Sequence, residues 1–147
     1  DLCDHLYAYE YEGEYYLIPG VEDALIPSFK KYMEKVNRSR DISNADSIRI
    51  ALQTALSDID ACESFYKSDV DNEYVILSET GMAKVPAAFR KEFDAVLGEY
   101  PEVKYIKDGY DKFAFKLDVE SNTCTVYVTN GSDFVEISPD IDYDFYF

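Results

Sequence analysis

The sequence predicts an α+β protein in which a long N-terminal α-helix packs on a three- to four-stranded antiparallel β-sheet. Between residues 21 and 66, apolar side chains recur at steps of three and four, the period of one helical face. Between residues 112 and 137, apolar and polar residues alternate in runs that turn residues separate. We expect one domain: a Tyr-rich arm or hairpin over 1–20, the long helix over 21–66, and a globular α+β part over 67–147.

The N-terminal arm contains two runs in which tyrosines alternate with other residues, and Glu12-Gly13 lies between them. This pattern predicts either a short hairpin or one extended strand with a kink. Leu17-Ile18-Pro19-Gly20 then turns the chain into the helix.

The long helix has two halves of different character. About 40 residues of continuous helix would be roughly 60 Å long, well above the usual length in a soluble domain. The polar segment 41–46 is weakly helical and could form a second N-cap that splits the helix. The second half, 45–59, has the cleaner apolar stripe and should cover the sheet. The predicted sheet-packing residues are Ile48, Leu52, Ala55, Leu56 and Ile59.

The first half of the helix is basic, although the chain as a whole is acidic. It carries five of the chain's 14 basic residues around a set of apolar side chains. Taken alone, this segment is most simply explained as a solvated helix face. The basic residues are Lys30, Lys31, Lys35, Arg38 and Arg40, and the apolar ones are Phe29, Tyr32, Met33 and Val36.

The rest of the chain predicts one more helix and several strands. The helix covers 85–97, with Pro86 at its first position and Gly98 as its C-cap. Asn130-Gly131 is the strongest hairpin signal in the sequence. The predicted strands are 74–78, 112–119, 123–129 and 133–137, with a further one over 141–147.

Composition excludes several classes of partner. The net charge of −16 and the pI near 4.2 mean that the chain has no net basic surface for nucleic acid, and they disfavour anionic membranes. No apolar run reaches the ~18 residues that a membrane helix needs. The sequence begins at Asp1 without Met, which indicates processing or a boundary that removed what came before.

No catalytic set is recognisable, so we expect a protein that is not an enzyme and that needs no cofactor. The single His5 has no nucleophile or orienting partner in a known pattern, and no glycine-rich phosphate-binding motif occurs. Cys3, Cys62 and Cys124 form no CxxC pair, which argues against zinc. One disulfide among them and three free thiols are both open.

Calcium is the metal that the acidic composition suggests. Acidic residues alternate over 69–73 and again over 140–144. Neither run has the glycine and glutamate positions of an EF-hand, and alternation in a strand or linker also describes a solvated face. We favour the solvated face and expect no metal.

Two segments carry a resemblance to a known family. They are ALIPSFKKYMEKVNRSRD, residues 24–41, and ADSIRIALQTAL, residues 45–56. They look like the N-terminal helix of type IV pilins and pseudopilins, especially those of Gram-positive bacteria, in which an Ile-Pro-Ser kink precedes a charged amphipathic half. The family's apolar membrane-anchoring span and its glutamate are missing before Leu25, so no assembly residue upstream of Pro27 can be carried over.

The resemblance implies an exported structural subunit of an extracellular filament on the bacterial cell surface. Its partners would be other pilin subunits, and the basic residues would face the acidic globular part of a neighbour. The alternative is a monomeric cell-surface binding or adhesin module whose Tyr-rich surface recognises a protein or glycan from a host or another surface. The expected assembly residues are Phe29, Lys31, Tyr32, Met33, Lys35, Val36 and Arg38.

Overall fold

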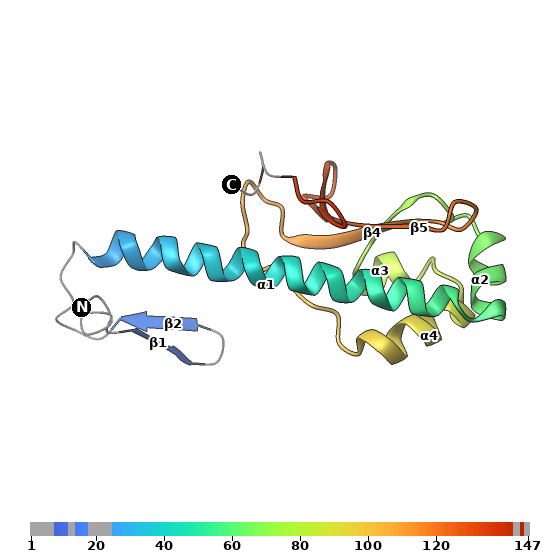
Figure 1. Ribbon diagram of the computed structural model, residues 1–147, viewed down its shortest axis with the longest axis horizontal. Coiled ribbons are helices and arrows are strands. Elements are labelled where there is room, and N and C mark those ends of the chain that lie inside the picture. The colour runs from blue at the N-terminus through green and yellow to red at the C-terminus, as the bar shows by residue number, and fades with distance from the viewer. Residues whose placement is uncertain (1–7, 12–13, 18–24, 143–144, 146–147) are drawn as a thin grey trace. The chain divides into compact units, whose positions relative to one another are not determined.

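The computed structural model describes residues 8–11, 14–17, 25–142 and 145. It confirms the α+β class, with a long helix, α1 (Leu25–Leu56), and a four-stranded antiparallel sheet (Figure 1). The chain divides into two compact units, Asp1–Asn37 and Arg38–Phe147, so the boundary between them falls inside α1.

The described part of the N-terminal unit contains a hairpin and the start of α1. Strand β1 (Ala8–Tyr11) pairs antiparallel with β2 (Glu14–Leu17), and Tyr9 lies opposite Tyr16. Of the two arrangements predicted for this arm, the structure has the hairpin.

Helix α1 is unbroken over its 32 residues, so the split predicted at 41–46 is wrong. Both carboxylates in that segment bind elsewhere in the fold, since Asp41 accepts hydrogen bonds from a loop and Asp46 accepts one from the Ser138 hydroxyl. Helix α1 ends at Leu56. Asp58 caps a second helix, α2 (Ile59–Tyr66), by accepting a 2.9 Å hydrogen bond from the Ala61 amide. The predicted single helix over 21–66 is therefore two helices, and residues 21–24 lie outside the described residues.

The sheet has the order β3-β4-β5-β6, with every pair antiparallel. The predicted turn at Asn130-Gly131 is present. The Asn130 side chain accepts hydrogen bonds from the Ser132 and Asp133 amides, and Gly131 takes a left-handed φ of 99°. The strands are β3 (Tyr74–Ile76), β4 (Lys112–Asp118), β5 (Thr123–Thr129) and β6 (Phe134–Ser138).

Two further helices follow β3. The predicted strand over 74–78 ends early because Ser78 caps α3 (Glu79–Met82), a helix that was not predicted, by accepting a hydrogen bond from the Gly81 amide. Helix α4 (Ala87–Leu97) ends at Gly98 as predicted, but Pro86 is its N-cap residue rather than its first helical residue.

Neighbouring chain contacts each edge strand of the sheet. At β3, α3 packs so closely that a methyl group on Gly81 would overlap the Ile76 carbonyl oxygen. At β6, the Asp142 amide donates to the Glu136 carbonyl. The chain thus turns back along β6, and the strand predicted over 141–147 is wrong at Ile141, Asp142 and Phe145; the other residues that it includes beyond Asp142 lie outside the described residues.

One hydrophobic core joins the helices to one face of the sheet. The second half of α1 and α4 lie on the same side of the sheet (Figure 1). The ring of Phe65 on α2 lies 4.7 Å from that of Phe89 on α4, and the Phe93 ring on α4 lies 6.0 Å from that of Phe115 on β4. The residues of α1 in this core are Ala45, Ile48, Ala51, Leu52 and Ala55.

Candidate functional site

The first half of α1 places the predicted assembly residues on a helix that is partly open to solvent. Tyr32 is 58% exposed, and the side chains of Lys31 and Lys35 are exposed as well. Phe29, Met33 and Val36 are half-buried. Together, Phe29, Tyr32, Met33 and Val36 follow the spacing i, i+3, i+4, i+7, which places them on one face of the helix. We call them the α1 stripe.

Charge is distributed unevenly between this segment and the rest of the chain. Residues 28–40 contain five lysines and arginines and one glutamate, whereas residues 41–147 contain 22 acidic and nine basic residues. Lys30, Lys31 and Lys35 form no ion pair with any residue that the structure describes. Opposite charges on one chain favour contact between copies, because the basic segment of one can face the acidic surface of another.

Arg38 differs from the three lysines because it contributes to the C-terminal unit. Its guanidinium carbon lies 5.1 Å from the centroid of the Tyr105 ring, within the range of a cation–π interaction. Its side chain is half-buried. Arg38 thus holds the loop before β4 against α1, in addition to any role in assembly.

Asp41 is a fully buried carboxylate at the centre of α1, and the sequence reasoning missed it. Its two oxygens accept hydrogen bonds from the Lys104 amide at 2.7 Å and the Tyr105 amide at 2.8 Å. Burial raises the pKa of Asp41, and these two backbone hydrogen bonds act in the opposite direction. The sequence contains one indication that Asp41 is buried, because Asp41 lies on the same helical face as the apolar residues Ala45 and Ile48.

The predicted sheet-packing face is confirmed in part. Ile48, Leu52 and Ala55 are fully buried, and Leu56 is half-buried against the core. Ile59 was wrongly placed on this face, because it is 81% exposed. The helix break before it is the physical reason, since α2 starts with a new axis.

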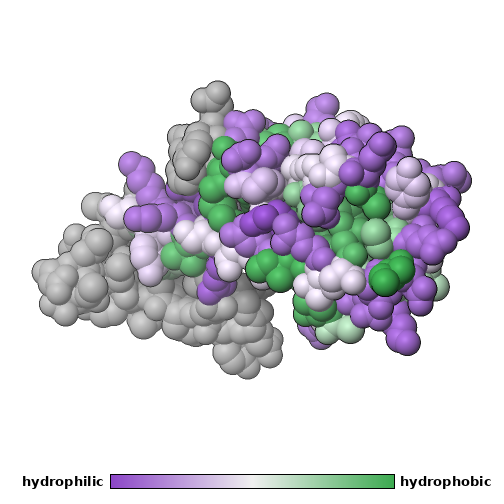
Figure 2. Space-filling model, turned by 45° about the vertical axis from the view of Figure 1, so that its right-hand side comes forward, coloured by the Kyte–Doolittle hydropathy of each residue, from purple (hydrophilic) through white to green (hydrophobic). Residues whose placement is uncertain are grey.

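A shallow apolar groove lies where α1 ends and α2 begins. It has a volume of about 340 Å³. In Figure 2 the end of the C-terminal unit that carries α2 is turned toward the viewer, and hydrophobic side chains reach the surface among hydrophilic ones. We call the apolar groove at the junction of α1 and α2 the α2 groove. It is lined by Leu56, Ile59, Cys62, Glu63, Tyr66 and Val119.

An aromatic cluster covers the face of the sheet that points away from the core. The rings of Tyr74 and Phe134 stack at 4.0 Å, and Tyr127 meets both edge-on. The Lys116 ammonium lies 4.9 Å from the centroid of the Tyr74 ring. Ala114 pairs with Tyr127 in the sheet and is only 1% exposed, so its small side chain lets the rings converge above it. Burial is the main factor that raises the pKa of the Tyr127 hydroxyl.

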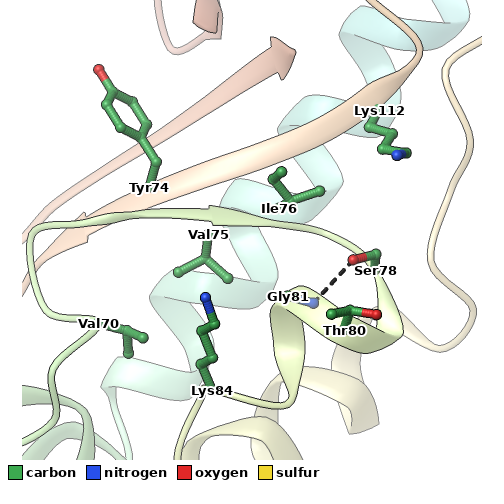
Figure 3. A pocket seen from close by; sticks show the side chains of 9 residues that line it. All are labelled: Val70, Tyr74, Val75, Ile76, Ser78, Thr80, Gly81, Lys84 and Lys112. Atoms are coloured by element: carbon green, nitrogen blue, oxygen red, sulfur yellow. Dashed lines mark hydrogen bonds between the residues drawn. The ribbon is translucent and has the colours of Figure 1, made fainter. Parts of the chain in front are cut away.

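A second pocket of about 430 Å³ lies beside β3 and α3 (Figure 3). Val75 and Ile76 form its apolar wall, and Lys84 and Lys112 bring ammonium groups to it. Among the described residues that line this pocket there is no carboxylate, imidazole or thiol. Ser78 and Thr80 bring hydroxyl groups to it, and the Ser78 hydroxyl accepts a hydrogen bond from the Gly81 amide.

We find no sign of a metal or catalytic role for the cysteines and the Asp71 carboxylate that the structure describes. Cys62 and Cys124 are free thiols, and burial raises the pKa of Cys124 to about 11; Cys3 lies outside the described residues. The Asp71 carboxylate accepts a hydrogen bond from the Val119 amide, so it fixes the turn between β4 and β5. No cluster of His, Cys, Asp or Glu that could hold a metal occurs within the described residues.

Comparison of the chain with protein-family models, curated proteins and solved structures finds no match. None of the helices that the structure describes has the length and hydropathy needed to cross a bilayer.

Proposed function

We propose that this protein is a structural subunit of a type IV pilus-like extracellular filament, and that its copies associate through the first half of α1. The proposal rests on a difference between the two halves of α1: the second half is buried in the core, and the first half is partly exposed. Ala45–Ala55 contributes to the core of the C-terminal unit, whereas residues 28–37 present Tyr32 and three lysines to solvent. Such a segment is best explained by a partner outside the chain.

The fold agrees with what the resemblance to type IV pilins implies. In that family a long N-terminal helix carries an amphipathic half that packs on an antiparallel sheet, and α1 with β3 to β6 has this arrangement. The sequence Ile26-Pro27-Ser28 lies at the start of α1. It matches the Ile-Pro-Ser sequence that precedes the amphipathic half of the helix in that family. Export to the cell surface follows from the same resemblance and belongs to the proposal.

Electrostatics explains how copies with the same net charge could associate. Two chains at −16 repel one another on average, so a stable contact needs a local reversal of sign. Lys30, Lys31 and Lys35 supply that reversal. Because they are exposed, their attraction to acidic residues should weaken as salt is added.

Replacing Lys30, Lys31 and Lys35 together by Glu should weaken self-association by at least about tenfold, because it reverses the charge of the three exposed lysines in the proposed contact. Sedimentation velocity at low ionic strength over a range of protein concentrations measures this. The matched control replaces Lys84, Lys91 and Lys112, which are also exposed, by Glu. Both variants lower the net charge by six, so only the position of the change differs.

Equal weakening in the two variants would show that general repulsion, and not the α1 segment, controls association. A wild-type chain that stays monomeric at every concentration would favour the second candidate, a monomeric binding module. The aromatic cluster of Tyr74, Tyr127 and Phe134 is the surface that such a module would use, because ring faces flanked by polar groups suit a protein or glycan ligand.

A further inference from the structure

We propose that the α2 groove is the surface that receives the α1 stripe of a second copy of this chain. The inference rests on the proposed function and adds the identity of the acceptor surface. Helix α2 has two apolar faces.

The first face of α2 is in the core, and the second is exposed. Ala61 and Phe65, four residues apart, are fully buried. Ile59, Cys62 and Tyr66 lie at i, i+3 and i+7 on another side of the helix, where Ile59 and Tyr66 are 81% and 52% exposed. A short helix of a monomer has no need of a second apolar stripe, and such stripes commonly mark contacts with another protein.

The α2 groove and the α1 stripe match in residue spacing and length. The groove residues Ile59, Cys62, Glu63 and Tyr66 have the same i, i+3, i+4, i+7 spacing as the stripe. Each set spans two helical turns, or about 10 Å, at the helical rise of 1.5 Å. Two helices with side-chain rows of equal length can pack ridge into groove, and this arrangement would place Tyr32 beside Ile59.

Charge is complementary as well. Glu63 lines the α2 groove, and exposed Asp60 and Glu120 lie next to its residues in the sequence. Lys67 forms an ion pair with Glu63 across one helical turn, so these two charges offset each other, and Asp60 and Glu120 supply the remaining negative charge beside the groove. The acidic surroundings of the groove favour the lysines that flank the α1 stripe, and they disfavour an anionic membrane surface as the occupant.

The first test replaces Ile59 by Asp. Since Ile59 is exposed, the substitution should leave the fold intact and weaken self-association by about tenfold or more, as expected for a central apolar contact. Ile106→Asp is the matched control, because Ile106 is an exposed isoleucine, at 61%, that lies outside the groove. It should change association by less than about twofold.

The second test uses the free thiol of Cys62 as a reporter. In a Cys3→Ser background, Tyr32→Cys is oxidised with copper phenanthroline and analysed on a non-reducing gel. We expect a disulfide-linked dimer that disappears when Cys62→Ser is added. Ile106→Cys in the same background should give little dimer.

The outcomes separate this inference from the proposed function. If association depends on Lys30, Lys31 and Lys35, but Ile59→Asp has no effect and Cys62 forms no cross-link, the α2 groove is not the acceptor and the proposed function stands. If Tyr32→Cys links to Cys62 within one chain, the inference is also overturned. If the wild-type chain does not associate at all, the proposed function fails and this inference fails with it.

Discussion

Replacing Leu52 by Ala is expected to lower the free energy of unfolding by about 2 to 5 kcal/mol, whereas Ile59→Ala should change it by less than about 0.5 kcal/mol. The two residues share one apolar stripe in the sequence, but Leu52 is fully buried and Ile59 is exposed. Leu52→Ala removes apolar contacts on α1 and leaves a cavity that the surrounding core cannot fill completely. Ile59→Ala removes a side chain that is mostly in water.

Urea unfolding followed by circular dichroism measures both variants. The slope with urea should be the same as in the wild type, since neither change alters the surface that unfolding exposes by much. Equal losses of stability in the two variants would contradict the arrangement of α1 and α2 described above.

Asp41→Ala should lower the free energy of unfolding by about 1 to 3 kcal/mol, because it leaves two partly buried backbone amides without their hydrogen-bond acceptor. The carboxylate of Asp41 joins α1 to a loop 63 and 64 residues later, through the Lys104 and Tyr105 amides. Asp41→Asn retains one acceptor oxygen, so its loss of stability should be smaller.

The contribution of Asp41 should also depend on pH. Burial raises its native pKa, so below an unfolded-state pKa of about 3.9 its contribution is fully present, and it declines as the pH rises through the native value. The unfolding free energy of the wild type minus that of Asp41→Asn should therefore fall as the pH rises above about 4. A difference that grows with pH would mean that the two backbone hydrogen bonds outweigh burial.

The fold class and the second half of α1 could be predicted because each depends on a local period. Ile48, Leu52 and Ala55 repeat at helical spacing inside one unbroken helix, so the period marks a single face. Ile59 continues the same spacing in the sequence, but Asp58 starts a new helix, so the face is no longer the same. A period read from sequence carries no information on where one helix axis ends and another begins.

The aromatic cluster and the α2 groove depend on contacts between distant parts of the chain, and these contacts could not be predicted from the sequence. The aromatic cluster brings together Tyr74, Tyr127 and Phe134 from three strands, and it requires the register that places Ala114 opposite Tyr127. The α2 groove likewise joins α2 to Val119 in the turn after β4. By contrast, the basic character of residues 28–40 is evident in the sequence, because charge is a property of composition.

The central claim, that the first half of α1 of one copy contacts the acidic C-terminal unit of another, is tested most directly by carbodiimide cross-linking. An equal mixture of isotope-labelled and unlabelled chains distinguishes links between copies from links within one chain. We predict links between copies that join Lys30, Lys31 or Lys35 to Asp60, Glu63 or Glu120. Links from these lysines that occur only within one chain, in a sample that sedimentation shows to be associated, would contradict the claim.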